Sequence, residues 1–316
     1  MRDYTYFSPS GITSKSAKSH RKFLAITLIL LIVGSITTPR LFRLFKSKQE
    51  LLSPTIDNGI KGASSASHKE LLATLEQEIA KGGGTYAIYI YDLKNKRGFG
   101  INEKTNFTAA SVNKIPILAA LYHLAGKGKI DLERIIVPQQ KDIQDYGTGS
   151  IRYDPTGTPY SLRSLARLMM EKSDNTAAYL IGTVIIGMDD IQRLVDGWGL
   201  TQTNMVENKS SVYDMSILLT KMYMQEITTP QLTAEMLGFM DKSDFDDRIP
   251  AGIEDGIVVY HKTGDEIGKI HDVGIVELAN NPYYLGVMTT DMRDDDATKK
   301  TIATISKTVF EFMNNL

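Results

Sequence analysis

Segments rich in β-branched and aromatic residues lie at both ends of the region from residue 85 to residue 290, and helical patterns fill the middle. This distribution constrains the fold because strands must pair, so segments far apart in the chain have to meet in one sheet. Two strands are expected near the start and three near the end, at Thr85–Tyr91, Gly98–Ile101, Ile257–Tyr260, Val273–Leu278 and Tyr284–Thr290. The sequence therefore predicts a sheet with an inserted helical lobe from about residue 112 to residue 240.

An amphipathic helix is expected on each side of this region, ending at Gly82 in the first case and spanning Thr298–Phe312 in the second. Their apolar positions are Leu71, Leu72, Leu75 and Ile79 in the first helix, and Ile302, Ile305, Val309 and Phe312 in the second. Such one-sided helices can cover one face of the sheet. The expected fold class is α/β, in layered α+β form, with residues 67–316 as one domain.

Residues Phe23–Thr38 form a run of sixteen residues without a charge, and basic residues flank it on both sides. Because the next turn can lengthen the run, we expect a transmembrane anchor at residues 23–42. A basic tail at residues 1–22 precedes it, and a polar tether at residues 43–66 follows it. A cleaved signal peptide is the alternative, for which Gly34–Ile36 is a poor cleavage site. Basic residues are equally frequent on the two sides, so charge does not determine the orientation.

Composition argues against several function classes. Lys and Arg number 36 against 37 Asp and Glu, for a net charge of −1, which disfavours a nucleic-acid binder. The chain has no cysteine, which excludes disulfides and thiol catalysis, and its five histidines are not at zinc-binding spacing. The glycine-rich stretches at 126–128 and 147–149 lack the rest of a phosphate loop, so they are interpreted as turns. We expect neither a metal nor another cofactor.

Three short motifs follow one another along the chain: Ser111-Val112-Asn113-Lys114, Ser173-Asp174-Asn175 and Lys262-Thr263-Gly264. The first pattern, S-x-x-K, is weak by itself, since it also occurs at residues 19–22 in the basic tail. S-D-N and K-T-G each occur once, and the three together are much less probable by chance. We therefore treat them as one candidate active site.

Ser111 directly precedes an apolar run suited to a buried helix. Residues three apart share a helix face, so the amine of Lys114 is expected to reach the hydroxyl of Ser111. A desolvated lysine with a lowered pKa can activate a serine as nucleophile. Free N–H groups at the helix start would also stabilise an oxyanion. Taken alone, Ser111 would be read as a helix cap and Lys114 as a surface lysine; the other motifs favour catalysis.

The remaining motifs suggest complementary roles. In the second, Ser173 can relay a proton to a leaving amine, Asn175 can hydrogen-bond a substrate amide, and Asp174 is expected to hold the loop together. In the third, which we expect to follow a strand, Lys262 supplies positive charge and Thr263 binds a carboxylate. Gly264 would let substrate lie along the strand edge. His261 is expected to be a packed neighbour rather than a base.

At these residues the chain resembles the class A β-lactamase-like serine hydrolases, of the β-lactamase and penicillin-binding protein superfamily. The resemblance covers roughly residues 68–316 and includes the segments Thr108–Ala110, Arg248–Gly252 and His271–Val276. It implies a five-stranded, mainly antiparallel sheet with an inserted all-helical lobe. It also implies Ser111 as nucleophile, Lys114 as base and Ser173 as proton shuttle, and an oxyanion hole formed by the backbone N–H groups of Ser111 and Asp265. The implied substrates are β-lactams or peptidoglycan stem peptides.

The sequence departs from this family at one point. Class A β-lactamases carry a glutamate in an E-x-x-L-N motif that activates the deacylating water, and this chain has no such motif. Glu207 lies at about the expected distance from Ser173, but it runs directly into the next expected helix, Tyr213–Tyr223. It is a weak candidate for the deacylation base. Without such a base, acylation can proceed while hydrolysis of the acyl-enzyme is slow.

These observations favour a membrane-anchored serine acyl hydrolase with its catalytic domain outside the cytoplasmic membrane, where β-lactams and peptidoglycan are met. Within this interpretation there are two alternative functions, a β-lactamase and a penicillin-binding protein or D-alanyl peptidase. The second alternative is a non-catalytic module that binds a wall fragment or a β-lactam. It is disfavoured because the acylating residues are present and the basic tail is too short for a signalling domain. The sequence does not give the oligomeric state.

Overall fold

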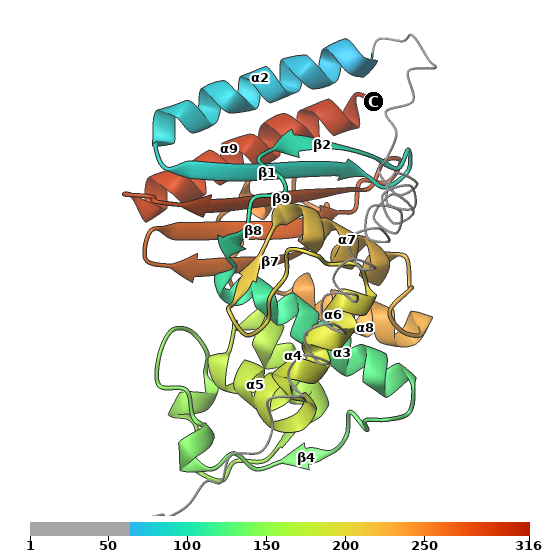
Figure 1. Ribbon diagram of the computed structural model, residues 1–316, viewed down its shortest axis with the longest axis vertical. Coiled ribbons are helices and arrows are strands. Elements are labelled where there is room, and N and C mark those ends of the chain that lie inside the picture. Colours follow the sequence, from blue (N-terminus) through green and yellow to red (C-terminus); the bar gives the residue numbers. More distant parts are fainter. Residues whose placement is uncertain (1–63) are drawn as a thin grey trace, which may run out of the picture. The chain divides into compact units, whose positions relative to one another are not determined.

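A five-stranded antiparallel sheet joins the two ends of the folded region, as the sequence predicts. In the computed structural model, which describes residues 64–316, its order is β2-β1-β9-β8-β7 (Figure 1). The register places Ile88 of β1 opposite Val287 of β9, almost 200 positions later in the chain. The strands are β1 (Thr85–Asp92), β2 (Arg97–Ile101), β7 (Val259–Glu266), β8 (Lys269–Val276) and β9 (Tyr283–Thr290).

Alternate side chains of β1 pack into two separate hydrophobic cores. Tyr86, Ile88 and Ile90 are buried in a cluster with the terminal helices. Ala87 and Tyr89 are buried in a second cluster with the helical lobe. Because successive strand residues point to opposite faces, one apolar strand packs against both layers. The sheet is thus the middle layer of the domain.

The terminal helices α2 (Ser64–Gly82) and α9 (Asp295–Asn314) lie side by side over one face of the sheet (Figure 1). Both were expected, although α2 begins at Ser64, three residues inside the segment predicted as tether. Asp294 caps the start of α9 by accepting a hydrogen bond from the backbone N–H of Ala297. This prediction of which elements cover the sheet is confirmed.

The lobe on the other face is mainly helical. It contains η1 (Ala110–Asn113), α3 (Lys114–Gly126), α4 (Leu162–Glu171), α5 (Asn175–Tyr179), the π-helix η4 (Leu180–Ile186), α6 (Met188–Gly197), α7 (Val212–Tyr223) and α8 (Pro230–Met240). The expectation of an all-helical lobe is wrong in detail. Two short antiparallel ladders form there because extended connecting segments satisfy each other's backbone groups. They pair β3 (Phe107–Thr108) with β6 (Lys209–Ser210), and β4 (Ile135–Ile136) with β5 (Tyr160–Ser161).

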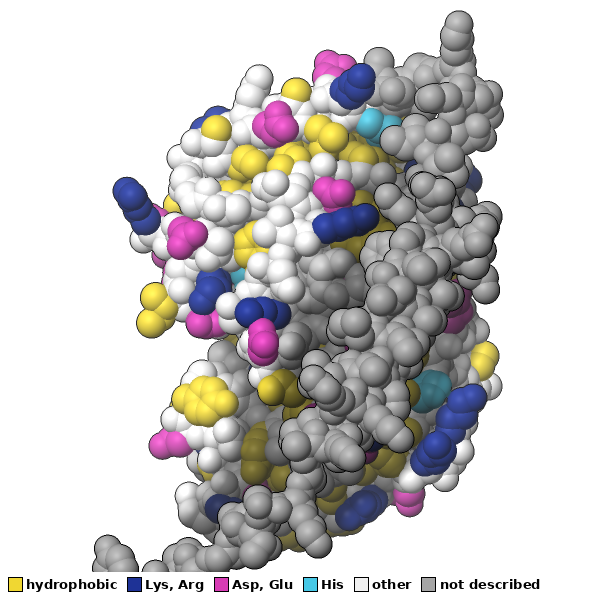
Figure 2. Space-filling view, in the orientation of Figure 1, with side chains coloured by type: hydrophobic (Ala, Val, Ile, Leu, Met, Phe, Trp, Pro, Cys, Tyr) yellow, Lys and Arg dark blue, Asp and Glu magenta, His cyan; other side chains and the backbone are white. Residues whose placement is uncertain are grey.

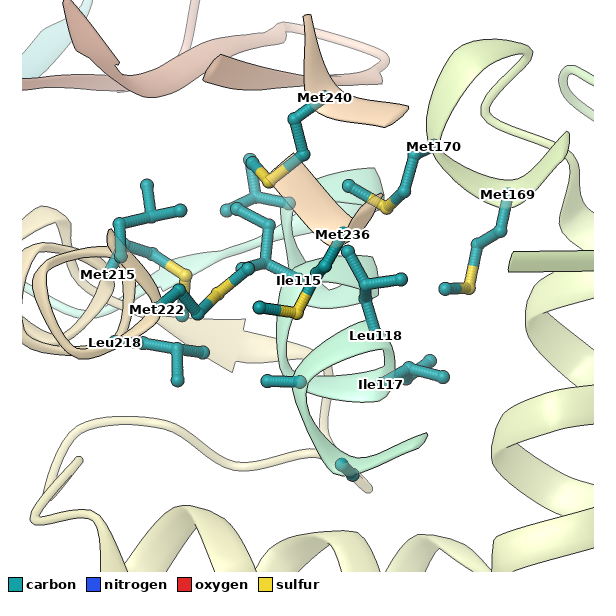
Figure 3. Packing of buried hydrophobic residues seen from close by; sticks show 14 of the residues in the cluster. Ile115, Ile117, Leu118, Met169, Met170, Met215, Leu218, Met222, Met236 and Met240 are labelled. Carbon is teal, nitrogen blue, oxygen red and sulfur yellow. The ribbon is translucent and has the colours of Figure 1, made fainter. Parts of the chain in front are cut away.

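Helix α3 is buried on all sides, from Lys114 through Tyr122. Figure 3 shows methionine side chains converging on Ile115 and Leu118 of this helix, among them Met170 from α4 and Met236 from α8. Methionine is unbranched and flexible, so it fills irregular gaps between helices. The packing holds α3, and the residues just before it, in a fixed position.

Strand bounds differ from the expected ones around the third motif. Strand β7 runs through Lys262–Gly264 instead of ending before it, and β8 already begins at Lys269. The reason is a tight hairpin at Ile267 and Gly268 that pairs Glu266 directly with Lys269. The motif is therefore part of a strand at the edge of the sheet.

The predicted basic tail, anchor and most of the tether lie outside the described residues. Within residues 64–316, no helix combines the length and apolar character that a membrane crossing requires. Figure 2 shows basic and acidic side chains interspersed over the described part of the face in view. This mixture is in keeping with the near-zero net charge.

Candidate active site

Ser111 lies in the single turn η1 that leads into α3. The residue before it, Ala110, has a φ of 48°, a left-handed conformation that costs free energy for any residue with a Cβ. The amine of Lys114, one turn later, lies 3.0 Å from Ser111 Oγ. This is the contact that the three-residue spacing predicts.

Lys114 is buried and contacts three further oxygens. Its Nζ lies 2.6 Å from the backbone oxygen of Ser173, 3.1 Å from Ser173 Oγ and 2.7 Å from Oδ1 of Asn175. Burial lowers the pKa of Lys114 well below its usual value, and the nearby Lys262 lowers it further. A neutral amine can donate two hydrogen bonds, one to the backbone oxygen of Ser173 and one to Oδ1 of Asn175. Its single lone pair is then left to accept a hydrogen bond from the hydroxyl of Ser111 or that of Ser173, which lie at 3.0 and 3.1 Å.

The second motif forms a turn between α4 and α5. Asp174 is buried at its centre and accepts hydrogen bonds from the backbone N–H groups of Ser150 (2.6 Å), Ile151 (2.9 Å) and Ala177 (2.9 Å). It therefore fastens the loop, as predicted. Gly149 allows this approach because a Cβ there would collide with the Asp174 carboxylate.

Tyr146 and residues 147–149, of which only the latter were interpreted as a turn, help to position the motif. The hydroxyl of Thr148 donates to the backbone oxygen of Ser173 at 2.8 Å. Nδ2 of Asn175 donates to the backbone oxygen of Tyr146 at 2.9 Å. Both ends of the Asn175 amide are thus engaged, one with Lys114 and one with Tyr146. In this structure its amide holds Lys114 in place, which the sequence did not indicate.

The third motif lies on β7, and its three side chains are placed differently. Lys262 is fully buried, and its Nζ donates to the backbone oxygen of Thr263 at 3.0 Å. Burial lowers the pKa of Lys262 to about 7, although Asp272 and Asp265 partly oppose the shift. At Gly264, a Cβ would lie 2.9 Å from the backbone oxygen of Ala109. Glycine is therefore required because β7 packs against the turn that carries Ser111.

Arg248 is a fully buried arginine that the motifs did not reveal. Its guanidinium lies 2.7 Å from Asp265 Oδ1 and donates to the backbone oxygen of His271 at 2.8 Å. These contacts tie the segment before β7 to the residue that follows the K-T-G motif. The only sequence signal was the resemblance of Arg248–Gly252 to a family segment.

His261 is buried between two carboxylates, at 2.9 Å from Asp272 and 3.2 Å from Asp246. Burial by itself would lower its pKa, but the two carboxylates outweigh burial and raise the pKa to about 9. Carboxylates only accept hydrogen bonds, so both ring nitrogens carry hydrogens. The side chain is a packed structural cation, in agreement with the expectation that it is not a base.

The three motifs meet at one cleft of about 550 Å³. The predicted site residues among its lining are Ser111, Lys114, Ser173, Asn175, Thr263 and Asp265. Lys262 lies buried in the adjoining strand and Gly264 against the Ser111 turn. Tyr146, which borders the cleft with its ring exposed, was not included in the predicted site.

Glu207 does not lie among the described residues that line the cleft. Its side chain is 56% exposed and pairs with Lys209 at 2.7 Å. The next residue, Asn208, lines the cleft and accepts a hydrogen bond from Nδ2 of Asn113 at 2.7 Å. The loop that contains these two residues thus presents the amide of Asn208 to the cleft and the carboxylate of Glu207 to solvent.

The described residues contain no group of three or more His, Asp or Glu side chains placed to hold a metal ion. The groups that meet at the cleft include the hydroxyls of Ser111 and Ser173 and the desolvated amine of Lys114. Together these can carry out acyl transfer to a serine.

A sequence model of the Beta-lactamase enzyme family matches residues 69–313. The chain belongs to this family. Beta-lactamase VEB-1 of Pseudomonas aeruginosa is 20% identical over 283 residues, which cover 80% of this chain and 93% of VEB-1. As a β-lactamase-family member, the chain is a serine hydrolase of the β-lactamase and penicillin-binding type.

Solved structures of the family superpose on most of the chain. PBP-A matches with a TM-score of 0.73 and 26% identity, covering 78% of this chain and 97% of PBP-A. A mutant of PBP-A, solved as an acyl-enzyme complex with penicillin G, matches with the same TM-score and coverage and 25% identity. These similarities agree with the β-lactamase-like fold predicted from the motifs.

Proposed function

We propose that this protein is a membrane-anchored serine acyl hydrolase that is acylated on Ser111 by a β-lactam or by a peptidoglycan-like amide. The observation that carries the proposal is the position of Lys114, whose Nζ lies 3.0 Å from Ser111 Oγ and 3.1 Å from Ser173 Oγ. One buried amine thus connects the nucleophile to a second hydroxyl. This arrangement supports proton transfer in both halves of an acyl transfer.

In the proposed reaction, Ser111 Oγ attacks the amide carbon while its proton passes to Lys114 Nζ. The tetrahedral oxyanion is held by the backbone N–H groups of Ser111 and Asp265. As the C–N bond breaks, Ser173 Oγ gives its proton to the leaving nitrogen and recovers one from Lys114. The products of this half-reaction are a Ser111 ester and an amine, which departs from an open-chain amide but stays attached to the acyl group when a β-lactam ring is opened.

The substrate carboxylate is assigned to the Thr263 end of the cleft. Thr263 lines the cleft there, and Nζ of the buried Lys262 donates to its backbone oxygen at 3.0 Å. A hydroxyl backed by a cation suits a carboxylate. Both substrate classes present an amide near a carboxylate, so this assignment accounts for either.

We further propose that hydrolysis of the acyl-enzyme is slow. The carboxylates that line the cleft, Asp265 and Glu266, are paired with Arg248 at 2.7 Å and Lys269 at 2.9 Å. Glu207 pairs with Lys209 outside the cleft lining. A water beside the Ser111 ester therefore has no free carboxylate base among these groups. The behaviour expected is that of a penicillin-binding protein or peptidase rather than an efficient β-lactamase.

Intact-mass measurement over time after mixing the full chain with a penicillin tests the proposal. The expected result is a persistent adduct of one penicillin, absent from Ser111→Ala. Rapid drug hydrolysis without an accumulating adduct would show an efficient β-lactamase and contradict slow deacylation. Neither adduct nor hydrolysis would overturn the proposed substrates and favour a non-catalytic binding module.

The proposed location is the outer face of the cytoplasmic membrane, with the chain anchored by residues 23–42. Its basis is the uncharged run with basic flanks and the place where β-lactams and peptidoglycan are found. The test is protease treatment of intact spheroplasts that express the full chain. Degradation of the catalytic domain is expected, and full protection would contradict the proposed orientation.

A further inference from the structure

One end of the active-site cleft is lined by uncharged side chains that the proposed reaction does not use. We call this end the apolar recess; it is lined by Ile117, Ala178, Tyr179, Thr183, Met188 and Met205. The cleft itself, of about 550 Å³, is continuous from this recess to Ser111 and Lys114. The recess is therefore within reach of a group attached to an acylated Ser111.

Three helices converge to form the recess. At Gly182 in η4, a Cβ would lie 3.1 Å from Cδ1 of Ile117 and 3.4 Å from Sδ of Met188. Ile117 on α3 and Met188 on α6 thus both approach the backbone of η4 at this point. Met205 also lines the cleft, and its backbone N–H donates to Oε1 of Gln192 on α6 at 2.8 Å, which ties it to this helix. These contacts give the recess a preformed shape.

The π-helix η4 contributes directly to the lining. Thr183 and its neighbour Val184 are both exposed, but of the two Thr183 lines the cleft and Val184 lies outside the described lining. A π-helical turn shifts side chains relative to an α-helix and is frequent at functional sites. Here it ends at Gly187, which has a φ of 95° that suits glycine. The two neighbouring residues offer a matched pair for mutagenesis.

The two ends of the cleft differ in chemistry. The Thr263 end carries Asp265 and Glu266, whereas the recess contains no charged side chain. A preformed concave surface of aliphatic, aromatic and thioether groups favours an apolar ligand. Since the leaving half of the substrate carries the carboxylate assigned to Thr263, the acyl half is the part free to occupy the recess.

We propose that the apolar recess binds a large apolar substituent, aryl or branched alkyl, on the acyl half of the substrate. This inference rests on the proposed function, because it presupposes acylation of Ser111. It assigns Thr183, Met188 and Met205 to substrate selection. Bulky apolar acyl groups are then preferred over small ones in the acylation step.

The test compares two penicillins that differ only in the acyl group, benzylpenicillin and the same nucleus carrying an acetyl group. Second-order rate constants for acylation are measured by intact mass on the full chain. We expect benzylpenicillin to react at least tenfold faster. In Thr183→Phe, which fills the recess, this preference should fall at least fivefold. The control Val184→Phe should keep it.

A second variant, Ala178→Leu, fills the recess from α5 and serves if Thr183→Phe does not fold. An unchanged preference in the filled variants, or an equal loss of rate with both penicillins, would overturn the assignment of the recess. Equal acylation rates of the unsubstituted chain with the two penicillins would also overturn the assignment. If neither penicillin acylates the unsubstituted chain at Ser111, the proposed function itself fails, and the assignment fails with it.

Discussion

The amine of Lys114 lies 2.6 Å from the backbone oxygen of Ser173, 59 positions later in the chain. The turn that carries the second motif therefore positions Lys114 of the first motif. Replacing Lys114 with Met removes the amine while keeping an unbranched apolar side chain. We expect the acylation rate constant to fall by about 10² to 10⁴, the range typical of a lost general base.

The measurement is the rate of adduct formation by intact mass. Lys172→Met is the control, because this neighbouring lysine pairs with Asp244 at the surface. It should acylate like the unsubstituted chain. A Lys114→Met rate within tenfold of the unsubstituted rate would contradict the role of Lys114 as base.

The acylation rate should depend on pH through both buried lysines. Lys114 must be neutral to accept a proton, so the rate should rise as pH increases through its lowered pKa. Lys262 must be protonated to attract a carboxylate, so the rate should fall as pH increases through about 7. A bell-shaped profile of the acylation rate constant is expected.

Because arginine keeps its charge, Lys262→Arg should move the alkaline limb to higher pH. An alkaline limb that stays in place would show that another group causes it.

Asp174 should contribute to stability as well as to the site. In Asp174→Ala, α5 loses its cap, at a cost of about 1 kcal/mol. The N–H groups of Ser150 and Ile151 also lose their acceptor, at about 1 to 3 kcal/mol for each one that stays buried. We expect the free energy of unfolding to decrease by about 3 kcal/mol or more, measured by urea denaturation. Asp174→Asn should lose less because an amide oxygen can still cap the helix. A change below about 1 kcal/mol in Asp174→Ala would contradict this account.

Glu207 should not affect turnover. Its carboxylate pairs with Lys209 and is outside the described lining of the cleft, so Glu207→Gln should leave the decay rate of the acyl-enzyme unchanged within twofold. The measurement is loss of the adduct after excess penicillin has been removed. A tenfold slower decay would restore Glu207 as the deacylating base. Lys209→Gln provides a matched control for the loss of the ion pair.

The sequence by itself determined the elements and the chemistry that is local in the chain. The spacing of Ser111 and Lys114 fixed their contact, since residues three apart meet on a helical turn. Segments rich in β-branched and aromatic residues identified β1 and β9. The residue type of Asp174 indicated a loop-holding role, which its three hydrogen bonds bear out. Such features depend on near neighbours, which a sequence displays directly.

Only the tertiary structure decided which distant groups meet. Gly264 is required by the approach of β7 to Ala109, and Asn175 holds Lys114, although neither relation has a trace in local spacing. Asn208 lines the cleft and Glu207 does not, because of the path of the loop that contains both residues. Burial of Lys114 and Lys262, and hence their lowered pKa values, likewise results from packing around the complete fold. Desolvation and long-range contact are properties of the assembled chain, so no local pattern encodes them.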